Sequence, residues 1–302
     1  MSTPPFGRLL TAMVTPFAAD GSVDLDAAAG LASYLVDDMG NDGLVISGTT
    51  GESPTTSDAE KADLLRVVLD AVGDRATILA GVGTFDTEHT LELAETAAKL
   101  GAHGLLVVTP YYSKPPQTGI LAHFRRVADS TDVPMMLYDI PGRAGVAIAT
   151  DTMLRLAEHP GIVAVKDAKG DLVASARVIA QSDLAYYSGD DAMTLPLLSV
   201  GAVGVVGTST HFSAIGTKRL IEAYLAGDVA TALRLHQQLL PIYTGIFATQ
   251  GCILVKAGLT LLGRDVGGLR SPLIEATPAE IEGLRSALAA ADLPPGGPVS
   301  TD

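Results

Sequence analysis

One lysine of this sequence is placed for covalent chemistry on a carbonyl compound. Lys166 closes the apolar run Gly-Ile-Val-Ala-Val, and the 302-residue chain has only seven lysines. Burial would disfavour its charged form, and a neutral amine can attack a carbonyl carbon to form a Schiff base. The alternatives are an ion pair with Asp139 or Asp167, or an amine that extends to solvent. Lys256 also follows an apolar stretch, but in a helical segment, where a structural or solvent-reaching lysine is expected.

Three further groups follow other apolar runs. Tyr138 ends the run Met-Met-Leu-Tyr, and its phenol could transfer protons while an imine forms, although such tyrosines are often simply packed. Residues 48–52, Gly-Thr-Thr-Gly-Glu, offer hydroxyl and amide donors for a carboxylate or a phosphate, or form an ordinary glycine-rich turn. Arg143 could bind a carboxylate through two parallel hydrogen bonds, or could be a solvent-exposed arginine.

Several other chemistries lack their sequence patterns. In the segment 81–86, Asp86 stands where a dinucleotide-binding loop needs its third glycine, and there is no phosphate-binding Walker loop. The six histidines lack metal-ligand spacing. Asp190 and Asp191 could bind a cation, but acids that open a helix are stabilised by its dipole without a metal. The sequence therefore predicts no metal site.

The elements that must carry these residues alternate regularly along the chain. Amphipathic helical patterns, with apolar residues at i, i+3, i+4 and i+7, separate short apolar runs. Buried apolar strands that alternate with helices predict a parallel α/β sheet, and eight such units suit a closed (β/α)8 TIM barrel. The strand runs begin at Leu9, Gly43, Thr77, Gly104, Pro134, Gly161, Leu184 and Val203.

The chain then changes character after the eighth unit. Residues 1–226 are predicted to form the catalytic barrel, and residues 227–302 a C-terminal α-helical appendage with a disordered Pro/Gly-rich tail over 293–302. Active sites of such barrels lie at the carboxyl ends of the strands. The lysine, tyrosine and threonines named above are therefore expected at one end, together with Gly189, which follows the seventh strand.

Composition restricts the partners and the location. The 20 basic and 34 acidic residues give a net charge of −14, which argues against binding to nucleic acid or to an anionic membrane. No apolar run approaches the roughly 18 residues of a membrane span, and the amino terminus lacks the basic region of a signal peptide. The single cysteine, Cys252, cannot form an internal disulfide. A cytoplasmic location is predicted.

The motifs together resemble a known family. Gly-Thr-Thr-Gly-Glu, Pro-Tyr-Tyr, Leu-Tyr-Asp-Ile-Pro-Gly-Arg, Val-Lys-Asp-Ala-Lys-Gly and Tyr-Ser-Gly-Asp-Asp, in this order on strand ends, closely resemble dihydrodipicolinate synthase. That family consists of pyruvate-dependent class I aldolase-type lyases and shares a superfamily with N-acetylneuraminate lyase. The resemblance runs from about Gly7 to about Leu293. A Gly-Thr-Thr-Gly-Glu loop in place of Gly-Ser-Thr-Gly-Glu, and an arginine after Tyr-x-x-Pro-x, favour the synthases over the sialic acid lyases.

The resemblance implies a reaction and a first set of residue roles. Lys166 would form an imine with pyruvate, with no other cofactor, and the derived enamine would attack aspartate 4-semialdehyde. The product would be 4-hydroxy-tetrahydrodipicolinate, the branch point of diaminopimelate and lysine biosynthesis. Tyr138, Thr49 and Tyr112 resemble the proton-relay triad of the family. Tyr112 would reach in from the neighbouring subunit of a tight dimer, within a homotetramer built as a dimer of dimers.

The resemblance also implies which residues bind the substrates. Thr50, with the Thr49 and Thr50 amides, resembles the site for the pyruvate carboxylate. Arg143 matches the arginine that binds the carboxylate of the semialdehyde. Val206 matches a residue whose main-chain carbonyl lines the pocket, and Gly189 completes the predicted set. The segment 207–211 departs from the Ser-Val-containing run of many synthases.

The positions of the family's lysine-inhibition site also differ here. Read without gaps, they are Asp58, Lys61, Phe85 and His89. A basic Lys61 and the loss of an asparagine and a glutamate remove acceptors that a dibasic ligand needs, so weak or absent inhibition by lysine is expected. Two other functions stay open: another pyruvate or 2-oxo acid aldolase, such as a 2-keto-3-deoxy sugar acid or sialic acid lyase, and a non-catalytic barrel that binds a 2-oxo acid.

Overall fold

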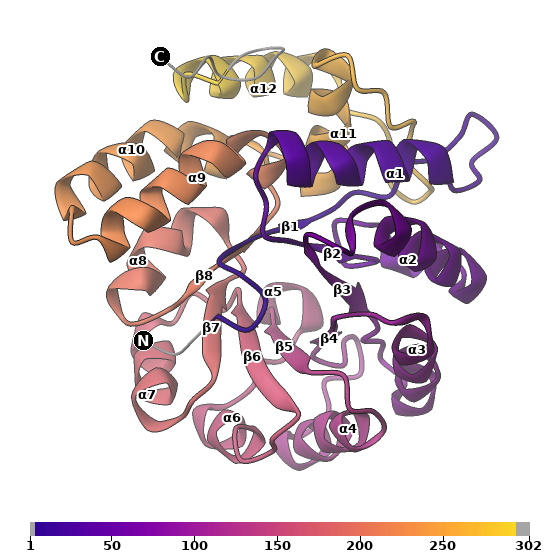
Figure 1. The fold of residues 1–302 in the computed structure, drawn as a ribbon, viewed down its shortest axis with the longest axis vertical. Helices are drawn as coiled ribbons and strands as arrows, with labels where there is room; N and C mark the ends of the chain where they lie inside the picture. The colour runs from indigo at the N-terminus through magenta and orange to yellow at the C-terminus, as the bar shows by residue number, and fades with distance from the viewer. Residues whose placement is uncertain (1–3, 294–302) are drawn as a thin grey trace.

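Parallel strands close into a barrel around the centre of the molecule. The computed structural model describes residues 4–293, and within them eight strands pair in sequence order, β8 closing on β1 (Figure 1). This confirms the predicted (β/α)8 barrel. The strands are β1 (Leu9–Ala12), β2 (Gly43–Ile46), β3 (Thr77–Gly81), β4 (Gly104–Val108), β5 (Met135–Asp139), β6 (Ile162–Asp167), β7 (Ala185–Ser188) and β8 (Gly204–Gly207).

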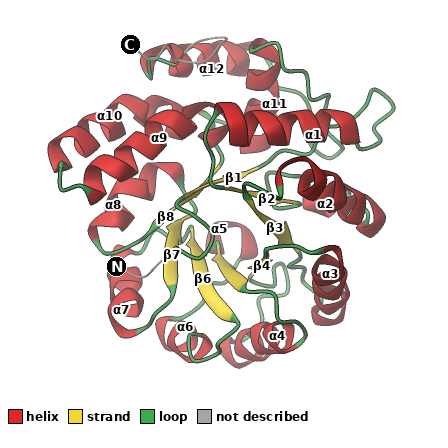
Figure 2. Cartoon of the chain, in the orientation of Figure 1, coloured by secondary structure: helices red, strands yellow, loops and turns green. Residues whose placement is uncertain are grey.

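Helices surround the strands on the outside of the barrel (Figure 2). Several begin where the sequence supplies a capping side chain: Ser57 and Glu60 form a reciprocal capping box at α2, and Asp86 caps α3. The helices of the barrel are α1 (Leu25–Ser33, continued by a π-helical turn over Tyr34–Asp38), α2 (Asp58–Val72), α3 (Thr87–Leu100), α4 (Gln117–Asp129), α5 (Pro141–Ala144), α6 (Thr150–Leu156), α7 (Leu172–Gln181), α8 (Thr194–Ser199) and α9 (Thr210–Leu225).

Three more helices follow the barrel. They are α10 (Val229–Gly245), α11 (Gly251–Leu261) and α12 (Pro278–Ala290). In Figure 1, α10 runs beside α9, and α12 lies outermost above α11. The C-terminal helices that the sequence predicted are therefore present. The boundary at residue 226 stays a prediction, and the predicted disordered tail lies, beyond Leu293, outside the described residues.

Strand alternation decides which side chains enter the barrel. Met136 and Tyr138 of β5 belong to the inner apolar cluster, whereas Leu137 packs in the outer cluster under the helices. On β6, Ala164 faces inward and Val165 outward, so the period of two turns the next residue, Lys166, inward. The side chains of Tyr138 and Lys166 at the strand ends thus point into the mouth of the barrel.

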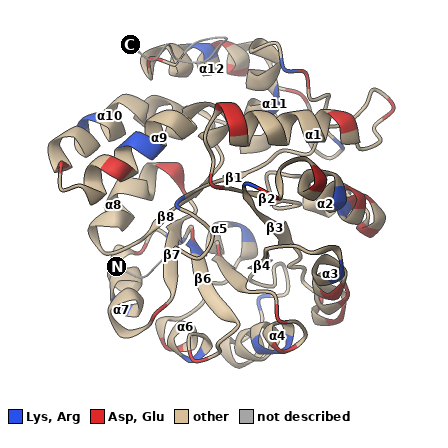
Figure 3. Cartoon of the chain, viewed as in Figure 1, with Lys and Arg blue, Asp and Glu red and all other residues tan. Residues whose placement is uncertain are grey.

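Charge is kept away from the barrel strands. Figure 3 shows most charged positions on the surrounding helices and loops, while the strands are almost free of them. Burial of an unpaired charge is costly, so the few charges at the strand ends, such as Lys166 and Asp167, stand out as exceptions. Within residues 4–293, no helix has the length and apolar character required to cross a membrane.

Candidate active site

A cavity of about 410 Å³ lies where the carboxyl ends of several strands meet the C-terminal helices. Six residues that the sequence singled out line it: Thr49, Thr50, Tyr138, Arg143, Lys166 and Gly189. They come from the loops or ends of β2, β5, β6 and β7, and only closure of the barrel brings these elements together. One concave site therefore combines an amine, a phenol, two hydroxyls and a guanidinium.

Lys166 is almost completely buried, with 4% of its surface exposed. Burial lowers the pKa of its amine to about 8; the nearby Asp191 carboxylate opposes this shift and the Arg143 guanidinium adds to it. Because the charged form is disfavoured, a useful fraction of the amine is a neutral nucleophile near neutral pH.

The two ion pairs that the sequence left open for Lys166 are not formed. Asp139 lies 3.6 Å from the Nζ of Lys169, and Asp167 accepts hydrogen bonds from the Ser175 hydroxyl and the Lys169 N–H. Both carboxylates are thus engaged on the outer side of the strands. The amine of Lys166 is directed into the cavity instead.

Tyr138 is the neighbour of Lys166 across the β5–β6 pairing. The Nζ of Lys166 lies 4.4 Å from the centre of the Tyr138 ring. Burial raises the pKa of the Tyr138 phenol to about 12, and Arg143 and the Thr49 hydroxyl only partly offset this. The phenol therefore stays protonated and is able to donate a proton or a hydrogen bond at the cavity.

Gly189 makes room for the lysine side chain. A Cβ atom at position 189 would stand 3.0 Å from Cγ of Lys166 and 3.1 Å from Cβ of Ala168. Both distances are shorter than ordinary van der Waals contact. The absence of a side chain at Gly189 thus leaves room for the stem of Lys166 beside the end of β7.

Asp191 has a larger role than the sequence indicated. Asp190 is the residue that caps the following helical turn, through its bond from the Ala192 N–H. Asp191 is instead buried and accepts the N–H groups of Thr208 and Ser209, both at 3.1 Å, and the Ser209 hydroxyl at 2.6 Å. Burial raises the pKa of its carboxyl. It ties the loop after β8 to the loop after β7 close to Lys166.

The turn after β2 offers donors to an anion. Within residues 4–293, neither the Thr49 nor the Thr50 N–H donates to another protein group, and both residues line the cavity. The Thr50 hydroxyl lies 3.3 Å from that of Thr208, which also lines the cavity. Converging N–H and O–H donors of this kind suit a carboxylate.

Two residues of the predicted set lie elsewhere in the described chain. Tyr112 is 92% exposed, with a left-handed φ of 71°, and does not line the cavity of its own chain. Val206 is fully buried among the inner residues of the barrel, below the lining residues. Its carbonyl as a pocket wall, and Tyr112 as a contribution from a neighbouring subunit, stay predictions.

The sequence did not predict the wall that the C-terminal helices provide. Tyr243 and Thr244 of α10, Phe247 from the link to α11, and Gln250 with the first turn of α11 all line the cavity. No local pattern marks these residues, because each is an ordinary helix or loop position until the helices fold over the barrel mouth.

Lys256, the second lysine considered, does not line this cavity. Its Nζ lies 2.8 Å from Oε1 of Glu52, and both side chains are at least 97% buried. The expectation of a structural lysine is therefore confirmed, although the amine is buried and does not reach solvent.

Comparisons with known proteins agree with this geometry. Residues 5–291 match the dihydrodipicolinate synthetase family. The chain is 68% identical over 287 residues to 4-hydroxy-tetrahydrodipicolinate synthase of Acidothermus cellulolyticus, covering 95% of this chain and 93% of that protein. It is 60% identical to 4-hydroxy-tetrahydrodipicolinate synthase 2 of Streptomyces coelicolor, covering 96% and 97% of the two chains.

A solved structure gives the same result for the fold. The crystal structure of DHDPS from Cyanidioschyzon merolae with lysine bound superposes with a TM-score of 0.94 at 43% identity, covering 96% of this chain and 99% of that one. The matches extend over nearly the whole chain in sequence and in structure. The chain belongs to the dihydrodipicolinate synthetase family.

Proposed function

We propose that this protein is a 4-hydroxy-tetrahydrodipicolinate synthase, which condenses pyruvate with L-aspartate 4-semialdehyde. The observation that carries the proposal is the convergence of Lys166, Tyr138 and Arg143 with the Thr49–Thr50 turn on one cavity. The names of relatives that are 68% and 60% identical support the same activity. The reaction would belong to the biosynthesis of diaminopimelate and lysine, in the cytoplasm.

In the first step, the neutral amine of Lys166 attacks C2 of pyruvate. The carbinolamine that forms loses water to give an imine, and the Tyr138 phenol supplies the proton for the departing hydroxyl. The pyruvate carboxylate is held by the N–H groups of Thr49 and Thr50 and by the Thr50 hydroxyl. Because pyruvate is held as a covalent imine on Lys166, the proposed reaction requires no separate cofactor.

In the second step, loss of a proton from C3 of pyruvate gives an enamine. Its C3 atom forms a bond to the aldehyde carbon of the semialdehyde, and the aldehyde oxygen takes up a proton through Tyr138 and Thr49. The amino group of the semialdehyde then displaces Lys166 from C2, which closes the ring and frees the enzyme. One water is released overall. Arg143 holds the semialdehyde carboxylate during this step.

The proposed assembly is a homotetramer built as a dimer of dimers. Support comes from Tyr112, a large aromatic residue that is 92% exposed in the single chain. In a tight dimer, Tyr112 would enter the partner's cavity and complete a relay with Tyr138 and Thr49. The same proposal includes weak or absent inhibition by lysine.

The first test is reduction with borohydride in the presence of pyruvate, followed by intact-mass measurement and peptide mapping. A pyruvyl-derived adduct is expected on Lys166 and absent from the Lys166→Met variant. Failure to form an adduct on folded wild-type protein, or an adduct on Lys256, would contradict the proposed function.

The acceptor is tested separately with Arg143→Ala. This change should raise the KM for aspartate 4-semialdehyde by on the order of tenfold or more, while the pyruvate adduct still forms on Lys166. Aldehydes of sugar-acid chemistry should not replace the semialdehyde in the wild type. Faster turnover of such an aldehyde would favour a different 2-oxo acid aldolase.

A further inference from the structure

The second buried lysine sits in a charged cluster behind the active-site turn. Nζ of Lys256, on α11, is 2.8 Å from Oε1 of Glu52 and 2.6 Å from the carbonyl oxygen of Gly268. It also lies 4.2 Å from the centre of the Phe17 ring. Burial lowers the pKa of Lys256, whereas the Glu52 carboxylate favours its charged form. The proposed reaction makes no use of this amine.

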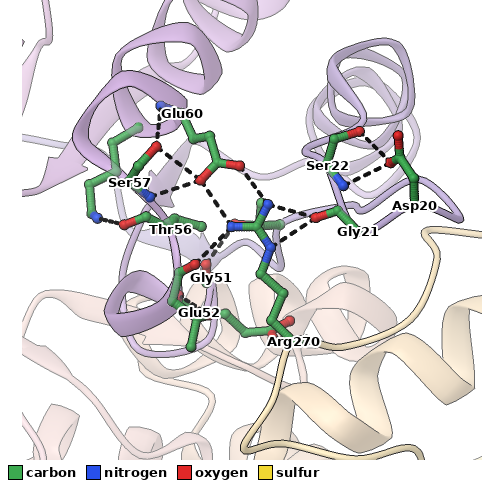
Figure 4. Close-up of polar contacts among 12 residues, drawn as sticks. Asp20, Gly21, Ser22, Gly51, Glu52, Thr56, Ser57, Glu60 and Arg270 are labelled. Atoms are coloured by element: carbon green, nitrogen blue, oxygen red, sulfur yellow. Dashed lines mark hydrogen bonds and ion pairs between the residues drawn. The ribbon is translucent and has the colours of Figure 1, made fainter.

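The main chain of Arg270 holds the other oxygen of the same carboxylate, while the guanidinium of this residue binds elsewhere. The N–H of Arg270 donates to Oε2 of Glu52 at 3.0 Å. The Arg270 guanidinium donates to Glu60 at 2.9 Å, to the Thr55 carbonyl at 2.7 Å and to the Gly21 carbonyl at 2.6 Å. Figure 4 shows Arg270 reaching from the C-terminal segment between Glu52, Glu60 and Gly21.

Glu52 is the residue on which the active-site turn ends. Its backbone is left-handed, with φ 55°, a conformation that a residue with a Cβ atom rarely adopts. Its N–H donates to the Thr49 carbonyl at 3.2 Å, and the Thr15 hydroxyl donates to the Gly51 carbonyl at 2.6 Å. The conformation that presents the Thr49 and Thr50 donors to the cavity is therefore anchored at Glu52.

We propose that Lys256 is a positioning residue for the pyruvate carboxylate and acts through Glu52, whose second carboxylate oxygen accepts the backbone N–H of Arg270. A buried ion pair of this kind is weak evidence for stability, because desolvation of both charges opposes it. What it supplies is a fixed geometry: the carboxylate is held from two sides, and the strained turn cannot relax. The same helix that carries Lys256 lines the cavity with its first turn, so the pair also joins two walls of the site. This inference rests on the proposed function.

The test compares two lysine-to-methionine variants. Lys256→Met removes the cation from Glu52. Lys218→Met is the matched control, because Nζ of Lys218 also holds a carboxylate and a carbonyl, those of Asp42 and Gly40, each at 2.9 Å, but at the opposite end of β2. Borohydride trapping is measured against pyruvate concentration for both variants and for the wild type.

Lys256→Met should raise the half-saturating pyruvate concentration by on the order of tenfold, because small displacements of positioning groups carry large effects. The adduct at saturating pyruvate should still form on Lys166, since the nucleophile is intact. Lys218→Met should trap pyruvate as the wild type does, whatever its loss of thermal stability. An unchanged half-saturating concentration in Lys256→Met would overturn the inference while leaving the proposed function in place.

Glu52→Gln and Lys256→Arg decide the matter if Lys256→Met does not fold. Glu52→Gln keeps the shape and the acceptor for the Arg270 N–H but removes the charge, and it should also weaken pyruvate trapping. Lys256→Arg keeps a cation beside Glu52 and should trap pyruvate better than Glu52→Gln does. If Lys256→Met does fold, the double variant Glu52→Gln/Lys256→Met is a further check: the two effects should not multiply, since both break one contact. The inference would be overturned if Glu52→Gln trapped pyruvate as well as the wild type does, or if the two effects multiplied fully. If the wild-type protein itself trapped no pyruvate, the proposed function would fail as well.

Discussion

The amine of Lys166 and the ring of Tyr138 face each other across the β5–β6 pairing, with Nζ 4.4 Å from the ring centre. Burial shifts the pKa values of the two groups in opposite directions: it lowers that of Lys166 to about 8 and raises that of Tyr138 to about 12. One group is thereby able to act as a nucleophile while its neighbour stays an acid. Such divergent pairs are typical of sites that combine nucleophilic and acid catalysis.

Imine formation should depend on pH through Lys166. With its pKa lowered to about 8, about one tenth of the amine is neutral at pH 7, against about 0.03% for an ordinary lysine. The trapping rate with pyruvate should therefore rise about tenfold per pH unit below 8 and level off above it. Stopped-time borohydride trapping between pH 6 and 10 measures this; a rate that still rises tenfold per unit at pH 9.5 would contradict the lowered pKa.

Loss of the Tyr138 hydroxyl should slow proton transfer without removing the amine. Tyr138→Phe keeps the ring over Lys166 and is expected to lower kcat by on the order of 10²-fold. The adduct with pyruvate should still form on Lys166, more slowly. Steady-state kinetics and mass measurement check both effects. A kcat within about twofold of wild type would show that the phenol takes no part in proton transfer.

Asp139 should make stability depend on pH. Burial raises the pKa of its carboxyl to about 6, with Lys169 and the Ile148 N–H partly opposing the shift. The folded state thus binds a proton more tightly than the unfolded state, whose value is near 3.9. Stability from this group is fully present below about pH 4 and is lost as pH rises through 6.

The measurement for Asp139 is the free energy of unfolding of wild type and Asp139→Asn from pH 4 to pH 7. The difference, wild type minus variant, should fall by roughly 2 kcal/mol across this range, since the amide cannot ionise. Asp132→Asn, at an exposed position, serves as the control and should show no comparable change. A difference that stays constant with pH would mean that Asp139 titrates normally.

Lysine should inhibit weakly or not at all. At the positions named for the inhibitor site, Lys61 donates to the Thr56 carbonyl and brings a positive charge, and Nε2 of His89 lies 2.9 Å from Asp58. Phe85, 62% exposed, packs edge-on against Tyr111. These groups offer few acceptors to a dibasic amino acid.

The check is an inhibition curve with L-lysine, run beside a lysine-binding relative. The Cyanidioschyzon merolae structure was solved with lysine bound, so that protein serves as the comparison. Half-inhibition at physiological lysine concentration would overturn the expectation. The double variant Phe85→Asn/His89→Glu, which adds acceptors, should increase the sensitivity.

The barrel and its strand-end residues follow from local patterns. Periods of 2 and 3.6 in the apolar residues are properties of short segments, and they predict eight strand–helix units with Lys166 at the end of the sixth strand. The inward direction of Lys166 and Tyr138 follows from the same alternation once the strands are placed. For this reason, the fold and the inward direction of Lys166 could be predicted with no knowledge of long-range contacts.

Other features depend on contacts between segments far apart in the chain. The sequence alone left Lys166 free to pair with Asp139, and only the packed structure shows that Lys169 lies beside that carboxylate. Similarly, nothing near Lys256 in the sequence points to Glu52, its partner in the charged cluster.

The order of apolar and polar residues in the sequence thus determined the barrel and the end at which the candidate residues gather, because hydrophobic periodicity and strand alternation act over a few residues. The tertiary structure alone decided the wall formed by Tyr243 and Phe247, the burial of Asp191 and the hold of Lys256 on Glu52. The physical reason is that burial and ion pairing are set by which surfaces meet when the C-terminal helices fold over the barrel. No short segment of the chain contains that information.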